Sequence, residues 1–151
     1  MRSLVNTMNY IIKEGTVNEL MYIENNIPEF SSPKSYAEIN AKIYARSYIL
    51  LVAYVNEQPA AYKLGYAKSG SLFYSWLGAV LPEFRGQGIA KGLLLRQEDK
   101  VRARAYQAIE VKSMNRFKRM LQMLIAHDYQ IVKCKQLDDG SDSKITFRKN
   151  L

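Results

Sequence analysis

The chain has 151 residues, of which 48% are hydrophobic, and its formal net charge is +8. This length and composition predict one globular domain, residues 1–151, that buries a core without disulfides or metal, and the single cysteine suits a reducing compartment. The first ten residues contain no apolar run of signal-peptide length, and no segment approaches the roughly 20 apolar residues of a membrane span. We therefore expect a soluble, cytoplasmic protein without a membrane partner.

The N-terminal third predicts a strand and two helices. Residues 8–13 form a short β-branched and aromatic run, which is typical of a strand. Thr16 and Glu19 make a capping box for a helix that ends near residues 25–26. A second helix is expected over residues 35–46. Its expected apolar face consists of Tyr36, Ile39, Ile43 and Tyr44.

Three strands joined by tight turns follow these helices. Residues 48–55 are strongly strand-like, residues 56–59 are typical of a hairpin turn, and residues 60–67 form the return strand. A second turn at residues 69–71 leads into a third strand over residues 72–80. The pattern predicts an antiparallel meander whose last strand leads to a glycine-rich segment.

The glycine-rich segment, residues 84–95, has the sequence FRGQGIAKGLLL. Gly86 and Gly88 allow a tight turn, and a pattern of helical period begins directly after them. The start of a helix offers unpaired N–H groups to an anion, and Arg85 adds a positive charge beside them. A phosphate-binding P-loop or a dinucleotide fold would need other residues at fixed positions, and Lys91 stands where the third glycine would be. The segment therefore predicts an anion site of another kind.

The C-terminal third predicts alternating helices and strands. A helix over about residues 88–106 leads to a strand over residues 108–112, which the helical crossover makes parallel to the strand before the loop. Asn115 can cap the next helix. Residues 129–135 and 144–148 close the chain as a hairpin. The expected apolar face of that last helix consists of Phe117, Met120, Leu121 and Leu124.

The loop and its surroundings resemble the acyl-coenzyme A loop of the GNAT superfamily of N-acetyltransferases. The family pattern is Arg or Gln, two residues, Gly, one residue, then Gly or Ala, and residues 85–90 match it in order. The preceding VLPEF, the following KGLL and the segment 115–129 lie at the family's spacing, and the order of elements is the family's topology. The resemblance implies an α/β (α+β) fold with a single mixed, largely antiparallel sheet of about seven strands. Helices would cover both faces, and strands four and five would splay apart.

The resemblance implies an acyltransferase that moves the acetyl group of acetyl-CoA, as co-substrate, to a primary amine by direct attack. The alternative is a non-catalytic acyl-CoA sensor or interaction module of the same fold. The implied cofactor-binding residues are Leu77, Gly78, Ala79, Val80, Arg85, Gly86, Gln87, Gly88, Ile89, Ala90, Asn115, Arg116 and Lys118. Candidate substrate-binding residues are Phe30, Tyr36, Tyr74 and Trp76. As a pure N-cap, Asn115 would need no cofactor, and both interpretations stay open.

The sequence contains few candidate catalytic residues. The resemblance makes the Val80 N–H the candidate oxyanion donor, and Tyr74 stands where the histone-acetylating branch has a glutamate base. Tyrosine is a poor base at neutral pH because its unperturbed pKa is about 10. Leu124 stands where the family often has a tyrosine acid. With one histidine and one cysteine, no metal site of ordinary spacing is expected.

The positive charge is concentrated between Arg85 and Arg119, where the sequence has ten lysine and arginine residues and only three acidic residues. This cluster could hold the phosphates of coenzyme A, or it could be a solvated helix face. It could also be a nucleic-acid footprint, but nucleic acid is the least favoured partner because no aromatic-interleaved basic ribbon or known nucleic-acid motif accompanies the charge. The edges of the C-terminal strands could pair two copies into a homodimer.

Overall fold

The computed structural model describes residues 9–30 and 32–151, so Met8 of the first expected strand lies outside the described residues. Within them, seven strands form one sheet in the order β1-β2-β3-β4-β5-β7-β6. The chain divides into two compact units, Met1–Leu64 with Gly78–Gln97 and Gly65–Leu77 with Glu98–Leu151. The mixed α+β fold class is confirmed, and the single domain over residues 1–151 stays a prediction.

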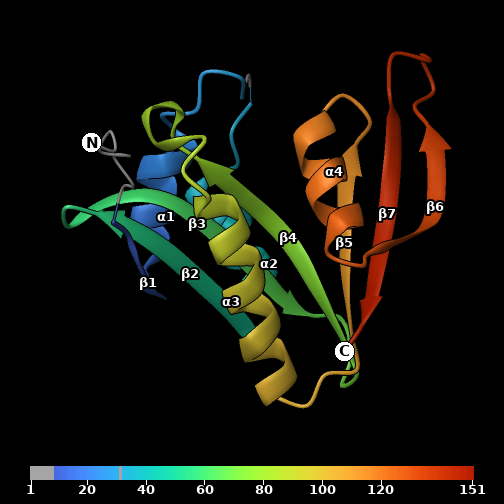
Figure 1. Cartoon of the computed structure of the whole chain (residues 1–151), viewed down its shortest axis with the longest axis horizontal. Coiled ribbons are helices and arrows are strands. Elements are labelled where there is room, and N and C mark those ends of the chain that lie inside the picture. Colours follow the sequence, from blue (N-terminus) through green and yellow to red (C-terminus); the bar gives the residue numbers. More distant parts are fainter. Residues whose placement is uncertain (1–8, 31) are drawn as a thin grey trace, which may run out of the picture. The chain divides into compact units, whose positions relative to one another are not determined.

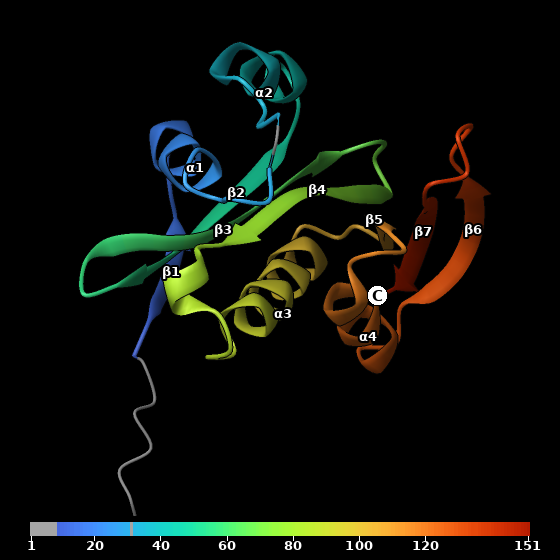
Figure 2. The same cartoon turned by 90° about the horizontal axis from the view of Figure 1, so that it is seen from above.

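The first unit contains β1 (Ile11–Glu14), β2 (Tyr48–Val55) and parts of β3 (Gln58–Ala67) and β4 (Leu72–Val80). Its helices are α1 (Val17–Glu24), α2 (Tyr36–Ile43) and the first part of α3 (Ile89–Ala103), with a 3-10 turn at Pro82–Phe84. β1 pairs antiparallel with β2, Ile12 opposite Ala53. Figure 2 shows α1 and α2 on one face of β2 and α3 on the other. Helices therefore cover both faces of this part of the sheet, as predicted.

Side-chain caps explain why α1 and α2 begin where they do. Thr16 and Glu19 form the predicted capping box, and Ser35 forms a second one with Glu38. The expected apolar face of α2 is only partly correct, because Ile39 and Ile43 are buried whereas Tyr36 and Tyr44 are exposed. Tyr44 is the C-cap, and its ψ angle of 129° with φ −58° is not helical, so its side chain does not continue the apolar face of the helix. Tyr36 is the first residue of the helix and lies at its exposed end.

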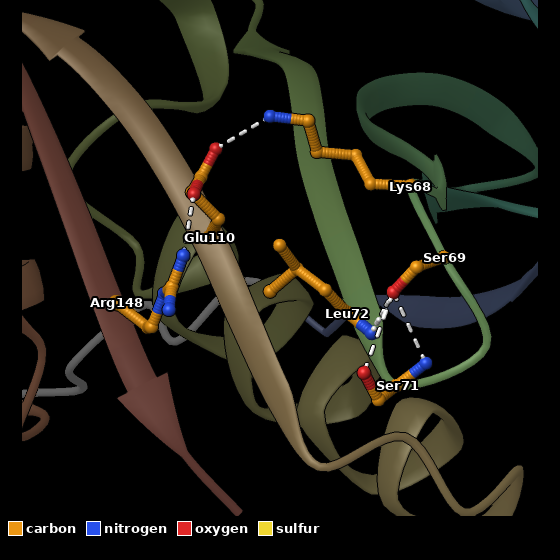
Figure 3. Close-up of polar contacts among 6 residues, drawn as sticks. All are labelled: Lys68, Ser69, Ser71, Leu72, Glu110 and Arg148. Carbon is orange, nitrogen blue, oxygen red and sulfur yellow. Dashed lines mark hydrogen bonds and ion pairs between the residues drawn. The ribbon is translucent and has the colours of Figure 1, made fainter.

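The second unit contains the remaining parts of β3, β4 and α3, together with β5, α4, β6 and β7. Their bounds are β5 Ala108–Met114, α4 Lys118–Ala126, β6 Gln130–Gln136 and β7 Ser143–Asn150. β7 pairs antiparallel with both β5 and β6, and α4 lies against β5 (Figure 1). The core of this unit contains Phe73, Ile109, Phe147 and Leu124. In the β3–β4 turn, the Ser69 hydroxyl accepts hydrogen bonds from the N–H groups of Ser71 and Leu72 (Figure 3).

The pairing of β4 with β5 is parallel, as the helical crossover predicts, and it is short. The registered pairs run from Leu72 with Ala108 to Ser75 with Val111. β4 itself continues to Val80, whereas β5 goes on pairing with β7 as far as Met114. The early end of the parallel ladder agrees with the splay that the resemblance implies.

The start of α4 differs from the prediction. Asn115 does not cap this helix, because the N-cap is Phe117 and no side chain caps it. The Asn115 N–H instead donates to the Ser143 carbonyl at 2.8 Å, which prolongs the pairing of β5 with β7. Of the expected apolar face only Leu124 is fully buried, and Phe117 is 39% exposed.

A buried polar network joins α3, β7 and Tyr129 in the second unit. The Tyr129 hydroxyl donates to the Glu98 carboxylate at 2.8 Å, and Lys149 Nζ lies 3.1 Å from the other carboxylate oxygen. Tyr129 and Glu98 are each 3% exposed, and Lys149 Nζ also lies 5.6 Å from the Tyr129 ring centroid. The network ties α3 to β7 and to the residue that precedes β6. It is the one place in this unit where a buried carboxylate meets both a hydroxyl and an ammonium group among the described residues.

Gln97 on α3 is fully buried, and neither polar atom of its amide finds a hydrogen-bond partner among residues 9–30 and 32–151. Burying an unpartnered amide costs free energy, and methionine has a similar shape without it. We expect Gln97→Met to raise the free energy of unfolding by about 1–2 kcal/mol in urea denaturation. Gln130→Met on exposed β6 is the control and should change it by less than about 0.5 kcal/mol. A destabilised Gln97→Met variant would show that the amide has partners in solution.

No helix in the described part of the chain is both long and apolar enough to cross a membrane.

Candidate functional site

The glycine loop between β4 and α3 has the geometry of an anion site. Gly86 and Gly88 have φ angles of +77° and +82°, and a Cβ at either position would meet no atom within 4 Å. The Gly92 N–H donates to the Gly88 carbonyl at 3.0 Å as the helix begins. The N–H groups that precede Gly92 therefore project from the helix start, where the helix dipole favours negative charge. The left-handed turn and the open space above it are what a bound phosphate requires.

Two contacts from the N-terminal segment hold the start of α3. The Tyr10 hydroxyl donates to the Gly88 carbonyl at 3.4 Å, and the Arg96 guanidinium donates to the Ile12 carbonyl at 3.2 Å. A Cβ on Gly92 would lie 2.3 Å from the Tyr10 hydroxyl, so a larger residue here would have to displace the Tyr10 side chain. Sequence reasoning missed Tyr10, although a glycine inside a helical pattern is a known signal of close approach.

Arg85 is engaged by the protein itself. Its Nε donates to the Val80 carbonyl at 3.0 Å, and its terminal nitrogens donate to the Glu29 carboxylate at 2.6 and 3.3 Å. These hydrogen bonds lower the pKa of Glu29. Arg85 therefore joins the segment after α1 to the end of β4. Its expected contact with a phosphate stays a prediction.

The end of β4 exposes small residues beside the glycine loop. Gly78 is exposed, and a Cβ there would lie 3.3 Å from the Tyr62 carbonyl oxygen, tighter than an ordinary contact. Ala79 and Val80 are half-buried. The backbone of this segment is therefore accessible to a ligand, which the predicted role of the Val80 N–H requires.

A buried acid lies under the same part of the sheet. The Glu24 carboxyl group at the end of α1 accepts a hydrogen bond from the Tyr62 hydroxyl on β3. Both residues are buried, at 3% and 1% exposure. Burial raises the pKa of Glu24, and the Tyr62 hydrogen bond opposes this only in part. Sequence reasoning missed the pair because its partners lie 38 positions apart.

The Glu24 carboxyl group should make stability depend on pH. Its pKa is higher in the folded than in the unfolded chain, so its contribution is present at low pH and is lost as the pH rises through the folded pKa. Glu24→Gln keeps an acceptor for the Tyr62 hydroxyl and removes this loss. The free energy of unfolding of Glu24→Gln should therefore exceed that of the wild type by more at pH 8 than at pH 5, in urea titrations. Glu38→Gln is the control, because the pKa of Glu38 is lowered and its carboxylate stays charged at both values.

If the excess does not grow with pH while Glu38→Gln behaves as expected, the Glu24 carboxyl group is not held in its protonated form by burial.

The candidate substrate residues of the second unit form an aromatic cluster. Tyr74 and Trp76 lie on one face of β4, with ring centroids 5.5 and 5.8 Å from that of Tyr66. Lys68 Nζ and Lys112 Nζ lie 5.3 and 5.5 Å from the Tyr74 ring centroid. Burial, followed by the charges of Tyr66 and Glu110, raises the pKa of Tyr74 to about 12. Tyr74 therefore keeps its proton at neutral pH, as expected of a poor base, and its catalytic role stays a prediction.

The other predicted site residues are distributed over both units. Val80, Gly78 and residues 85–90 come together in the first unit, whereas Tyr74 and Trp76 come together in the second. In the second unit, Asn115 and Lys118 are exposed, Leu77 is half-buried, and Arg116 forms an ion pair with Asp142 at 3.3 Å. In the first unit, Phe30 is half-buried and Tyr36 is 52% exposed.

The sequence matches one protein family over most of its length. Residues 17–123 match the family described as Acetyltransferase (GNAT) family. No curated protein matches the sequence. Solved structures match the fold along nearly the whole chain.

The fold is similar to that of the ribosomal-protein-S18-alanine N-acetyltransferase from Escherichia coli, with a TM-score of 0.83, 15% identity and 94% of each chain covered. It is also similar to a GNAT family acetyltransferase from Elizabethkingia anophelis with acetyl-CoA bound, with a TM-score of 0.74, 16% identity and 95% and 99% coverage. A third similar structure is Arabidopsis thaliana NAA60 in complex with a bisubstrate analogue, with a TM-score of 0.78, 10% identity and 94% and 98% coverage. At these identities the likeness concerns the fold alone.

Proposed function

We propose that this chain, which belongs to the acetyltransferase (GNAT) family, transfers the acetyl group of acetyl-CoA to a primary amine. The glycine loop carries the proposal, because two residues in the left-handed region turn the backbone into the start of α3 and leave open space above it. A pyrophosphate fits such a site through N–H groups and the helix dipole. The fold is also that of an acetyltransferase with acetyl-CoA bound.

Backbone groups of the first unit would hold the cofactor. The N–H groups of residues 87–90 would take the pyrophosphate, and the segment from Gly78 to Val80 would lie along the pantetheine arm. A Cβ built on Gly78 would lie 3.3 Å from the Tyr62 carbonyl oxygen, which favours a small residue at this position. In the second unit, Leu77, Asn115, Arg116 and Lys118 are the further candidates. Basic residues at the start of α4 oppose its dipole, which favours an anion beside them.

The transfer is a direct displacement at the thioester carbonyl. The amine nitrogen forms a bond to the carbonyl carbon, the carbon–sulfur bond breaks, coenzyme A leaves as the thiolate, and the nitrogen gives up a proton. The Val80 N–H would stabilise the negative charge that develops on the carbonyl oxygen. The pKa of Tyr74 is about 12, so its hydroxyl stays protonated and can donate a hydrogen bond. Because a protonated Tyr74 does not accept the proton of the amine, that proton would go to water.

A second candidate function is a non-catalytic acyl-CoA sensor of the same fold. The chain lacks a side-chain base at Tyr74 and has Leu124 in place of the usual acid, and both observations favour it. Such a protein would bind acetyl-CoA and release no thiol.

The two functions differ in the release of free coenzyme A. We expect the wild-type chain to release thiol from acetyl-CoA when a primary amine is added, in a colorimetric thiol assay over a panel of amino acids, peptides, polyamines and aminoglycosides. The same amines with blocked nitrogen are the controls and should give only background hydrolysis. Saturable binding of acetyl-CoA without thiol release for any amine would support the sensor, and absence of binding would contradict both functions.

A further inference from the structure

One face of the sheet in the second unit collects positive charge. The register places alternate residues of β5, β7 and β6 on this face, opposite Ile109, Phe147 and Leu124 of the buried side. Figure 2 shows α4 on the buried side only. The face, which we call the basic face, carries six cations and one carboxylate, namely Lys68, Lys112, Lys133, Lys135, Lys144 and Arg148 with Glu110.

Glu110, the carboxylate of the basic face, forms ion pairs through both of its oxygens. One oxygen of Glu110 lies 2.9 Å from Lys68 Nζ and the other lies 3.1 Å from the Arg148 guanidinium, so Glu110 on β5 joins the β3–β4 turn to β7 (Figure 3). Burial opposes its ionisation, but the hydrogen bonds from Lys68 and Arg148 outweigh this and lower the pKa of Glu110. Glu110 is therefore charged at neutral pH and already neutralised, and it leaves the rest of the face positive.

Four lysines of the basic face are exposed, in addition to the two cations that pair with Glu110. Lys112 lies beside the Tyr74 ring, while Lys133, Lys135 and Lys144 come from the β6–β7 hairpin, Lys135 directly opposite Lys144. The turn of the hairpin contains Asp138 and Asp139, which lie beyond Lys135 along the chain. Like charges directly opposite one another on a sheet destabilise it. Their presence here favours a bound partner of opposite charge.

We propose that the basic face binds an acidic segment of the polypeptide that carries the acceptor amine. The inference rests on the proposed acetyl transfer and names its acceptor class. Neighbouring strands lie about 5 Å apart and alternate residues of one strand about 7 Å apart, so the lysines form a grid that carboxylates of an extended acidic peptide can match.

Two features of the basic face favour a polypeptide over a nucleic acid. Bases stack on exposed aromatic faces, but Tyr66 is buried, and two ammonium groups lie over the Tyr74 ring. Five of the six cations are lysines, whereas arginine is the residue suited to phosphate recognition in a fixed geometry. Trp76 on the same face of β4 is half-buried and packs against Tyr66, so it presents only part of its ring. The face therefore offers attraction over a wide area with little aromatic surface for stacking.

The test is direct binding of a fluorescein-labelled decaglutamate peptide to the full chain at low salt, followed by fluorescence anisotropy. The double variant Lys133→Glu/Lys144→Glu should weaken binding about tenfold, since two attractions become repulsions. Arg104→Glu/Arg119→Glu is the matched control, because it makes the same change in net charge at exposed positions of α3's end and α4, and it should change affinity less than about twofold. Added salt should weaken the binding of the wild type.

Three results would overturn the proposal: no binding of decaglutamate at low salt, an equal loss in both double variants, or tighter binding of a ten-nucleotide oligouridine than of the peptide. Binding is measured without acetyl-CoA, so a failure here leaves acetyl transfer to be judged by the thiol assay. If decaglutamate binds as expected and acidic peptides with a free N-terminus release no more thiol than neutral ones, the acceptor class is wrong although the face binds acid.

Discussion

Replacement of Gly88 by aspartate should abolish the stabilisation of this protein by acetyl-CoA. A ligand that binds only the folded state at 100 times its Kd stabilises by about 2.7 kcal/mol, which for a chain of this length raises Tm by roughly 5 to 10 °C. The Gly88 φ angle of +82° strains any side chain, and a carboxylate in the open space above it would repel a phosphate. Differential scanning fluorimetry with and without acetyl-CoA should therefore show a shift for the wild type and none for Gly88→Asp.

Gly140→Asp is the matched control for backbone strain. Gly140 lies in the β6–β7 turn with a φ angle of +72°, so aspartate meets a similar penalty there and is far along the chain from the loop. This variant should melt lower than the wild type and keep the full shift with acetyl-CoA. If Gly88→Asp keeps the shift as well, the start of α3 is not where the cofactor phosphates bind.

Replacement of Glu98 by alanine should give the largest loss of stability. The change leaves the Lys149 ammonium group without its carboxylate and the buried Tyr129 hydroxyl without its acceptor. Removing one partner of a buried ion pair costs about 3–5 kcal/mol because the other charge stays desolvated. We expect a fall in Tm of roughly 10 °C, with a matching shift of the urea midpoint.

Asp99→Ala is the control for this loss. Asp99 is next to Glu98 in the chain, but its side chain is 74% exposed and its carboxylate makes only a 3.4 Å contact with Arg102. It should change the free energy of unfolding by less than about 0.5 kcal/mol. Similar losses for Glu98→Ala and Asp99→Ala would mean that the buried network contributes little beyond helix propensity.

Local signals predicted the framework of the fold well. The strands over residues 48–55 and 72–80 have the predicted bounds, because β-branched and aromatic runs between turns determine them locally. The capping box of Thr16 and Glu19 is confirmed for the same reason, since its partners lie three residues apart. The seven-stranded mixed sheet followed from the order of elements and the resemblance together.

Predictions that depended on distant partners were less successful. Asn115 has the side chain of an N-cap, but the Ser143 carbonyl on another strand takes its N–H into the sheet instead. Tyr44 fits the helical period of α2 in sequence, yet the helix ends before it. No local pattern could show that Tyr62 reaches Glu24, or that Tyr10 is the residue that approaches Gly92.

The candidate site shows the same division. The glycine loop was predicted from residues 84–95 and the segments beside them, because backbone turns and helix starts are local features. The grouping of positive side chains on the basic face could not be predicted from local features. The sequence showed a cluster between Arg85 and Arg119, whereas the basic face takes cations from the β3–β4 turn, β5, β6 and β7 that only strand pairing brings to one side.

The most direct test of acetyl transfer is mass spectrometry of an acceptor peptide. A peptide with a free N-terminus and a glutamate-rich tail is incubated with the protein and acetyl-CoA that carries an isotopically labelled acetyl group. We predict one labelled acetyl group on the N-terminal amine, present only when the protein is present and absent with Gly88→Asp. If no amine in a wide panel gains the label while acetyl-CoA still raises the Tm of the wild type, the protein binds the cofactor without using it, and the proposed transfer is contradicted.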